Sequence, residues 1–89
     1  MNAIVTVVGK DKVGIIAGIS AFFAGLNINI IDITQTILSG NFVMMMMVDL
    51  SGSDKPLDAM KADIAGLGES MGVSINIMHE QVFSAMHRI

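Results

Sequence analysis

The sequence contains no cysteine, which excludes disulfide bonds, thiolate catalysis and thiolate metal sites. It also contains no tryptophan or tyrosine, and only five lysine or arginine residues against eight acidic residues. A surface that follows a phosphate backbone and stacks bases on aromatic rings cannot be built from these side chains. We therefore expect no nucleic-acid partner.

Long apolar runs are missing as well. No uninterrupted apolar stretch approaches the roughly 20 residues that a membrane-spanning helix needs. The first residues, MNAIVTVVGKD, lack the basic segment and the cleavage site of a secretion signal. We therefore expect a cytoplasmic chain with no membrane partner, and its 89 residues predict one domain over 1–89.

Hydrophobic side chains are in excess. They make up 53% of the residues, whereas charged side chains make up 15%. A small two-layer domain cannot bury so many apolar groups by itself, and surplus apolar surface on a chain of this kind marks an interface. We therefore expect a homodimer or a larger even oligomer.

The spacing of the apolar residues predicts the order of the elements. Short β-branched or alternating segments, typical of strands, alternate with segments whose apolar residues recur every three or four positions, typical of helices. The order is strand, helix, strand, strand, helix, strand, which is that of the ferredoxin-like fold. The expected strands are 3–8, 29–38, 42–50 and 73–78, and the expected helices are 15–26 and 57–71.

This order implies an α+β fold, a two-layer βαββαβ sandwich. Each crossover must be right-handed, so both helices should cover the same face of one four-stranded antiparallel sheet. The tail residues Val82, Phe83, Met86 and Ile89 are spaced as in a short C-terminal amphipathic helix. The opposite face of the sheet then has no cover from the core fold.

Four consecutive methionines interrupt the expected alternation in the third strand. In a strand, Met44 and Met46 point to one face, and Met45 and Met47 point to the other. One pair should meet the helices, and the other should lie on the uncovered face beneath a lid supplied by the tail or by a second subunit. A one-residue slip exchanges the two pairs, so the pattern alone does not say which is which.

The stretch VVGKDKVGIIAGISAFFAGLNINIIDITQ resembles the ACT domain, a small regulatory module attached to many enzymes of amino-acid metabolism. The matching features are the first strand, the Asp-x-x-Gly turn at Asp11–Gly14, a helix ending near Gly25, Asn29 with Ile30 opening the second strand, and Gln35. Over its full length the chain is similar to stand-alone single-ACT-domain proteins of unassigned activity, and to the ACT repeats of the regulator of the glycine cleavage system. Val13 stands where many ACT domains have proline.

The resemblance implies a ligand site between the first loop and the entrance of the second strand, commonly at a subunit interface. Carried over to this sequence, its residues are Asp11, Lys12, Val13, Gly14, Ile15, Asn29 and Ile30. A helix N-terminus offers free amides to a carboxylate, and an asparagine offers both a donor and an acceptor to a zwitterion. Asp11 is expected to cap the helix.

The implied function is regulatory binding of a small molecule, most simply an amino acid, by a dimer. A protein that it regulates would be a further partner. The alternative is a structural or protein-interaction module of the same fold with no ligand. The polar groups of the first loop and of Asn29 favour the first interpretation, because a scaffold would not need them.

Catalysis is not indicated. The glycines form neither a dinucleotide-binding nor a Walker pattern. On one helix, His79 and His87 would lie about 12 Å apart by helical rise, too far for one metal ion. Acylphosphatases of this fold need an arginine in the first loop, and metal chaperones of this fold need a cysteine pair; the sequence has neither. We expect no enzyme activity, no cofactor and no bound metal.

Overall fold

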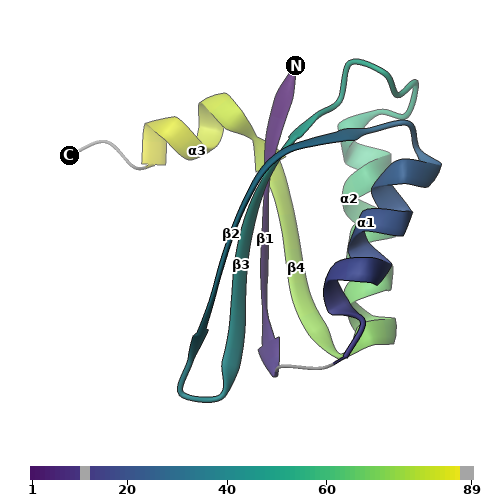
Figure 1. The fold of residues 1–89 in the computed structure, drawn as a ribbon. Coiled ribbons are helices and arrows are strands. Elements are labelled where there is room, and N and C mark those ends of the chain that lie inside the picture. Colours follow the sequence, from purple (N-terminus) through teal and green to yellow (C-terminus); the bar gives the residue numbers. More distant parts are fainter. Residues whose placement is uncertain (11–12, 87–89) are drawn as a thin grey trace.

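The computed structural model describes residues 1–10 and 13–86, and within them it has the predicted order of elements (Figure 1). Asp11, Lys12, His87 and Ile89 therefore lie outside the described residues. The order of elements is β1 (Asn2–Lys10), α1 (Ile15–Gly25), β2 (Asn29–Leu38), β3 (Asn41–Asp49), α2 (Leu57–Met71), β4 (Val73–His79) and α3 (Glu80–Met86).

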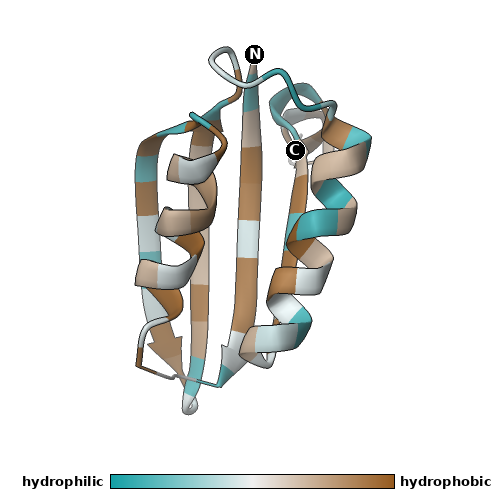
Figure 2. Ribbon diagram, turned by 90° about the vertical axis from the view of Figure 1, so that its right-hand side faces the viewer, coloured by the Kyte–Doolittle hydropathy of each residue, from teal (hydrophilic) through white to brown (hydrophobic). Residues whose placement is uncertain are grey.

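The four strands form one antiparallel sheet in the order β2-β3-β1-β4, which confirms the ferredoxin-like arrangement. The two long helices cross the same face of this sheet (Figure 2). The short helix α3 leaves the end of β4 on the opposite side (Figure 1). We call that side, from which α1 and α2 are absent, the open face.

Strand pairing decides which methionines enter the core. Met44 and Met46 pair with Val7 and Val5 of β1, and all four side chains lie between the sheet and the helices. Each is at most 1% exposed. Met45 is 40% exposed on the open face, and Met47 is half-buried there. The four methionines thus serve two surfaces at once, a closed core and an open sheet.

The register of β2 contains one irregularity that its alternating sequence does not reveal. Ile30 pairs with Val48 and Asp32 with Met47, so Ile31 has no partner on β3. This bulge turns Ile30 toward the core side, where it packs against buried residues, and leaves Ile31 51% exposed. Strict alternation along 29–38 would place Ile31 on the same face as Ile33, and the bulge breaks that alternation.

Glycine ends α2 where the spacing predicts its end. Gly72 has φ 72° in the left-handed region, and its N–H donates to the carbonyl oxygens of the last turn. We expect Gly72→Ala to cost about 1 kcal/mol in the free energy of unfolding, because a Cβ is strained at this φ. Denaturant titration measures the loss. Gly25→Ala, in the last turn of α1 with open space around its Cβ, is the control and should cost nothing.

Candidate functional site

The structure places the two halves of the predicted ligand site at opposite ends of the sheet. Asn41 of β3 pairs with Lys10 on one side and with Leu38 on the other, so the first loop and the end of β2 are neighbours. Asp49, at the far end of β3, pairs with Asn2 and Asn29. Strands of nine or ten residues are about 30 Å long. Within one subunit, Asn29 therefore cannot meet the first loop.

The first loop is described from Val13 onward. Val13 is fully exposed, and Gly14 caps α1 with φ 89°, a left-handed conformation that suits glycine. The first bond of the helix runs from the N–H of Gly18 to the carbonyl oxygen of Gly14, at 2.9 Å. The amides before Gly18 are thus the orphan donors of this helix end, and its first turn contains no acidic side chain. This end of α1 is electrically suited to an anion.

Burial limits what Ile15 can contribute to the predicted site. Its side chain is 3% exposed and belongs to the core, so it can offer a ligand only its backbone N–H. Ile16, one residue later, points into a groove of about 400 Å³ between α1 and the second half of β2. The other residues that line this groove are Gln35, Thr36, Ile37 and Phe42.

Gln35 is one of the groove residues that the sequence-based site omitted. It pairs with Met44, which places it on the helix side of the sheet between Ile33 and Ile37. The sequence shows a polar amide in a row of aliphatic side chains. That this amide lies near the first loop follows only from the strand order. The groove therefore combines apolar walls with one amide donor and acceptor beside the free amides of α1.

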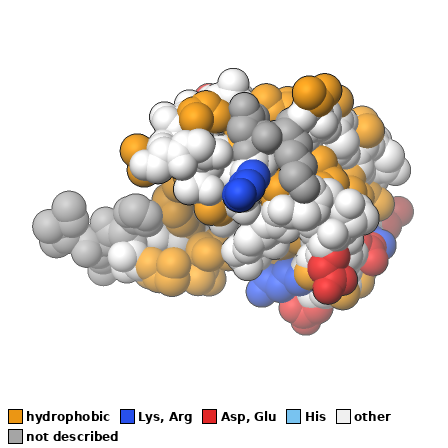
Figure 3. Space-filling model, turned by 90° about the horizontal axis from the view of Figure 1, so that it is seen from below, with side chains coloured by type: hydrophobic (Ala, Val, Ile, Leu, Met, Phe, Trp, Pro, Cys, Tyr) orange, Lys and Arg blue, Asp and Glu red, His pale blue; other side chains and the backbone are white. Residues whose placement is uncertain are grey.

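The surface at this end of the molecule is mixed. Seen from below, a basic side chain lies near the middle and acidic side chains gather toward one edge (Figure 3). Lys10 is exposed at the end of β1, beside the first loop. Among the described residues, a carboxylate arriving at α1 would therefore meet the positive charge of Lys10.

The Asn29 end of the sheet is chemically different. The hydroxyl and backbone N–H of Ser51 donate to Asp49 at 2.7 and 3.0 Å, and these bonds lower the pKa of the Asp49 carboxyl. The N-terminal amine lies 3.9 Å from the same carboxylate. Asn29 is exposed beside this cluster, and its side chain makes no hydrogen bond within the described part of the chain. Asn29 is free to serve a partner.

The outer edge of β2 is the most prominent unpaired feature of the sheet. β2 is an edge strand of ten residues, and every residue except Ile30 is exposed. It contains no lysine and no proline, the residues that most often protect such edges. An edge of this kind is competent to pair with another strand.

Two other site types have no support in residues 1–10 and 13–86. No group of three or more histidine or acidic side chains there is placed to hold a metal ion. Within the same residues, none of the helices combines the length and the hydropathy needed to cross a membrane.

Comparison with known proteins gives a consistent result. Residues 2–78 match the family model of the ACT domain. A UPF0237 protein of Listeria monocytogenes is 53% identical over 89 residues, which is 100% of both chains. The structure of an ACT domain protein from Streptococcus pneumoniae is 42% identical and superposes with a TM-score of 0.84 over 93% of each chain.

A more distant match shows the fold alone. A chain whose structure was assigned to a glycine cleavage system transcriptional repressor is 20% identical. It superposes with a TM-score of 0.72 over 89% of this chain and 47% of its own length.

Proposed function

Because the chain belongs to the ACT domain family, we propose that it is a regulatory module that binds a small carboxylate-bearing molecule, most simply an amino acid. The observation that carries this proposal is the groove beside the free amides of α1, which opens next to an unpaired strand edge. We propose no catalytic role, because among the described residues the groove offers an amide, a hydroxyl and apolar side chains but no general acid, base or nucleophile pair.

The complete site requires two subunits. If two β2 strands pair antiparallel along their outer edges, the Asn29 end of one strand lies beside the Leu38 end of the other. The partner subunit's Asn29 and the partner subunit's Ile30 then approach the first loop, which one chain alone keeps about 30 Å away. This pairing reunites the two halves of the predicted site across a two-fold axis.

Each group in this site has a chemical task. The amides at the start of α1 hold the ligand carboxylate, with Gly14 allowing close approach. Ile16, Ile37 and Phe42 surround its apolar part, and Gln35 reads a polar substituent. The partner's Asn29 completes the recognition of the amino group. Asp11 and Lys12 flank the site in sequence and belong to the same proposal.

The proposed assembly is a homodimer or a larger even oligomer acting in the cytoplasm, with a regulated protein as its downstream partner. The second candidate is a scaffold of the same fold that pairs through β2 but binds no ligand. The unpaired edge alone supports it, since an edge needs no ligand to pair. Ligand binding separates the two candidates.

The test is a thermal-shift screen with the twenty amino acids at millimolar concentration. A ligand that binds only the folded state adds about 2.7 kcal/mol at a hundredfold excess over Kd. In a domain of this size that raises the melting temperature by several degrees or more. We expect at least one amino acid to do so. No shift with any of the twenty would favour the scaffold.

Two variants locate the site. Asn29→Ala should abolish the shift while leaving the melting temperature of the free protein nearly unchanged, because Asn29 is exposed and unbonded. Gly14→Val should abolish it too, with some loss of stability from the strained φ of 89°. Asn76→Ala, exposed on β4, is the matched control and should retain the shift. A shift that survives both site variants would place the ligand elsewhere.

A further inference from the structure

The helix α3 forms an arm that stands off the open face. It begins directly after β4, where the N–H of Gln81 donates to His79 Nδ1 at 3.2 Å and directs the first turn. From there it runs away from the sheet (Figure 1), and hydrophobic side chains line it where it leaves the body (Figure 3). None of its seven residues is buried.

Such an arm is not self-supporting. Isolated helices shorter than about 12 residues are marginal in water, so a seven-residue helix depends on packing. Val82 and Met86 lie four positions apart, on one side of the helix, and are 52% and 63% exposed. The apolar side of the arm therefore has too little cover within its own subunit.

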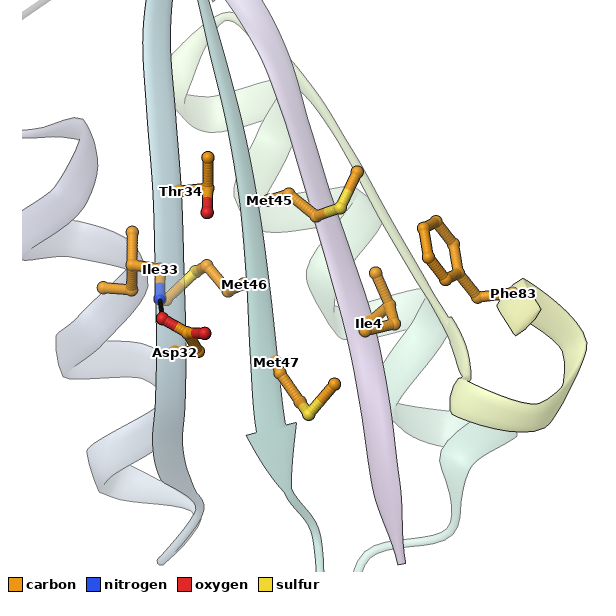
Figure 4. A pocket seen from close by; sticks show the side chains of 8 residues that line it. All are labelled: Ile4, Asp32, Ile33, Thr34, Met45, Met46, Met47 and Phe83. Atoms are coloured by element: carbon orange, nitrogen blue, oxygen red, sulfur yellow. Dashed lines mark hydrogen bonds between the residues drawn. The ribbon is translucent and has the colours of Figure 1, made fainter. Parts of the chain in front are cut away.

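A groove separates the arm from the sheet. Its floor is formed by Ile4, Met45 and Met47, and Phe83 of the arm faces them from the other side (Figure 4). Asp32 and Thr34 of β2 form the remaining wall. The groove measures about 180 Å³, well below the 300–1,000 Å³ typical of small-molecule sites. Its size and its methionines suit a few apolar side chains of a protein partner.

We infer that the partner is a second copy of this chain, whose α3 arm inserts into this groove while its own groove receives the arm of the first. The same side of the molecule carries both the projecting apolar residues and the hollow that fits them. A surface that contains both parts is self-complementary, which is the condition for a two-fold interface. This arm exchange does not depend on the proposed ligand.

The size of the surface agrees with such a contact. Three strands about 30 Å long and one about 23 Å long, spaced about 4.8 Å apart, present roughly 540 Å² in projection, and the arm adds to it. Each subunit thus contributes on the order of 600 Å², which meets the lower bound of a stable interface, about 1,200 Å² in total.

The geometry also sets the symmetry axis. One arm stands over β1, next to Ile4, and the groove beside it lies over β2 and β3 at the same end of the sheet. Two arms can lie side by side there only if the two-fold axis runs parallel to the strands. That axis places the two Asp32 carboxylates on opposite sides of the interface. Asp32 has no cationic partner among the described residues, and this separation spares the dimer a like-charge contact.

The arm exchange uses the open face, whereas ligand binding was proposed at the outer edge of β2. The two interfaces therefore use different surfaces of the subunit. We expect the parent protein to sediment with at least twice the chain mass at micromolar concentration.

Cross-linking tests the arm directly, since the natural sequence has no cysteine to interfere. Two separately purified variants, Met45→Cys and Met86→Cys, are mixed, allowed to exchange subunits and treated with a short bismaleimide. We expect a covalent dimer that contains one chain of each variant. The control mixture, Ala62→Cys with Met86→Cys, should give little, because Ala62 lies exposed on α2. Equal yields in the two mixtures would overturn the arm exchange.

A charge on the arm provides the second readout. Met86→Asp should lower the mass of the assembly, because an unpaired carboxylate would have to enter the apolar groove. Ser84→Asp, on the exposed side of the same helix, should leave the mass unchanged. Circular dichroism confirms that both variants fold. An unchanged mass for folded Met86→Asp, or a parent protein that sediments as a monomer, would overturn the inference.

Discussion

Replacing Met46 with aspartate should unfold the chain, whereas the same replacement at Met45 should leave it folded. Met46 is 1% exposed beneath the helices, and Met45 is 40% exposed on the open face. A carboxylate buried without a partner costs several kcal/mol. That approaches the whole stability of a domain of this size, about 5–10 kcal/mol. Two adjacent residues of identical type should therefore give opposite outcomes.

Far-ultraviolet circular dichroism and thermal melting distinguish the two variants. The Met45→Asp chain should melt cooperatively but sediment as a smaller assembly, because its carboxylate lies on the groove floor (Figure 4). Ala62→Asp, at the exposed surface of α2, controls for added charge and should both fold and assemble. If Met46→Asp folds as well as Met45→Asp, the register between β1 and β3 described above is incorrect.

Two glycines of α2 should respond to the same substitution with opposite signs. A Cβ on Gly68 would lie 2.7 Å from the carbonyl oxygen of Val73 and 3.3 Å from a side-chain carbon of Ile75. Backbone cannot yield as a flexible side chain can, so α2 would have to move away from β4. We expect Gly68→Ala to lower the free energy of unfolding by about 1–3 kcal/mol, the usual cost of overpacking.

Gly66→Ala should raise the same quantity. Gly66 lies in the same helix, is exposed, and has open space around the position of a Cβ. Alanine is favoured over glycine in helices by about 0.5–1 kcal/mol. In denaturant titration, the unfolding midpoint of Gly68→Ala should therefore lie below that of the parent protein, and the midpoint of Gly66→Ala should lie above it. If Gly68→Ala proved as stable as Gly66→Ala, the close packing of α2 on β4 would be contradicted.

Local patterns predicted the helices and strands well, because the residue spacing within each element and the glycines at its end mark its type and its bounds. The bounds of β2 and α2 agree with the prediction to the residue, since Gly72 ends α2 and the turn around Gly40 ends β2. Which methionines point into the core and which point to the open face depends on the pairing of β3 with Val5 and Val7, which is a long-range contact. No local pattern contains that information.

The candidate site was harder to predict for the same reason. The family pattern joins the first loop with Asn29, and both are present, but the strand directions separate them within one subunit. Gln35, Ile37 and Phe42 come together with Ile16 only through the sheet order. The bulge at Ile31 likewise arises from pairing and leaves no mark in the alternation. Helix periodicity also could not separate buried Ile15 from groove-lining Ile16, one position apart.

The edge of β2 has a consequence for how the protein must be handled in a cell. Its first half is shielded by the bulge at Ile31 and the charge of Asp32, but the second half, Ile33–Leu38, has neither charge nor proline. Uncharged β-branched segments of this length are the segments from which ordered aggregates grow. In a subunit without a partner, this edge would stay unpaired and could bind a strand of any other chain. Each added strand would present a new unpaired edge. Dilute or overproduced subunits should thus be the ones that chaperones and proteases remove, so that assembly acts as the protein's own quality control.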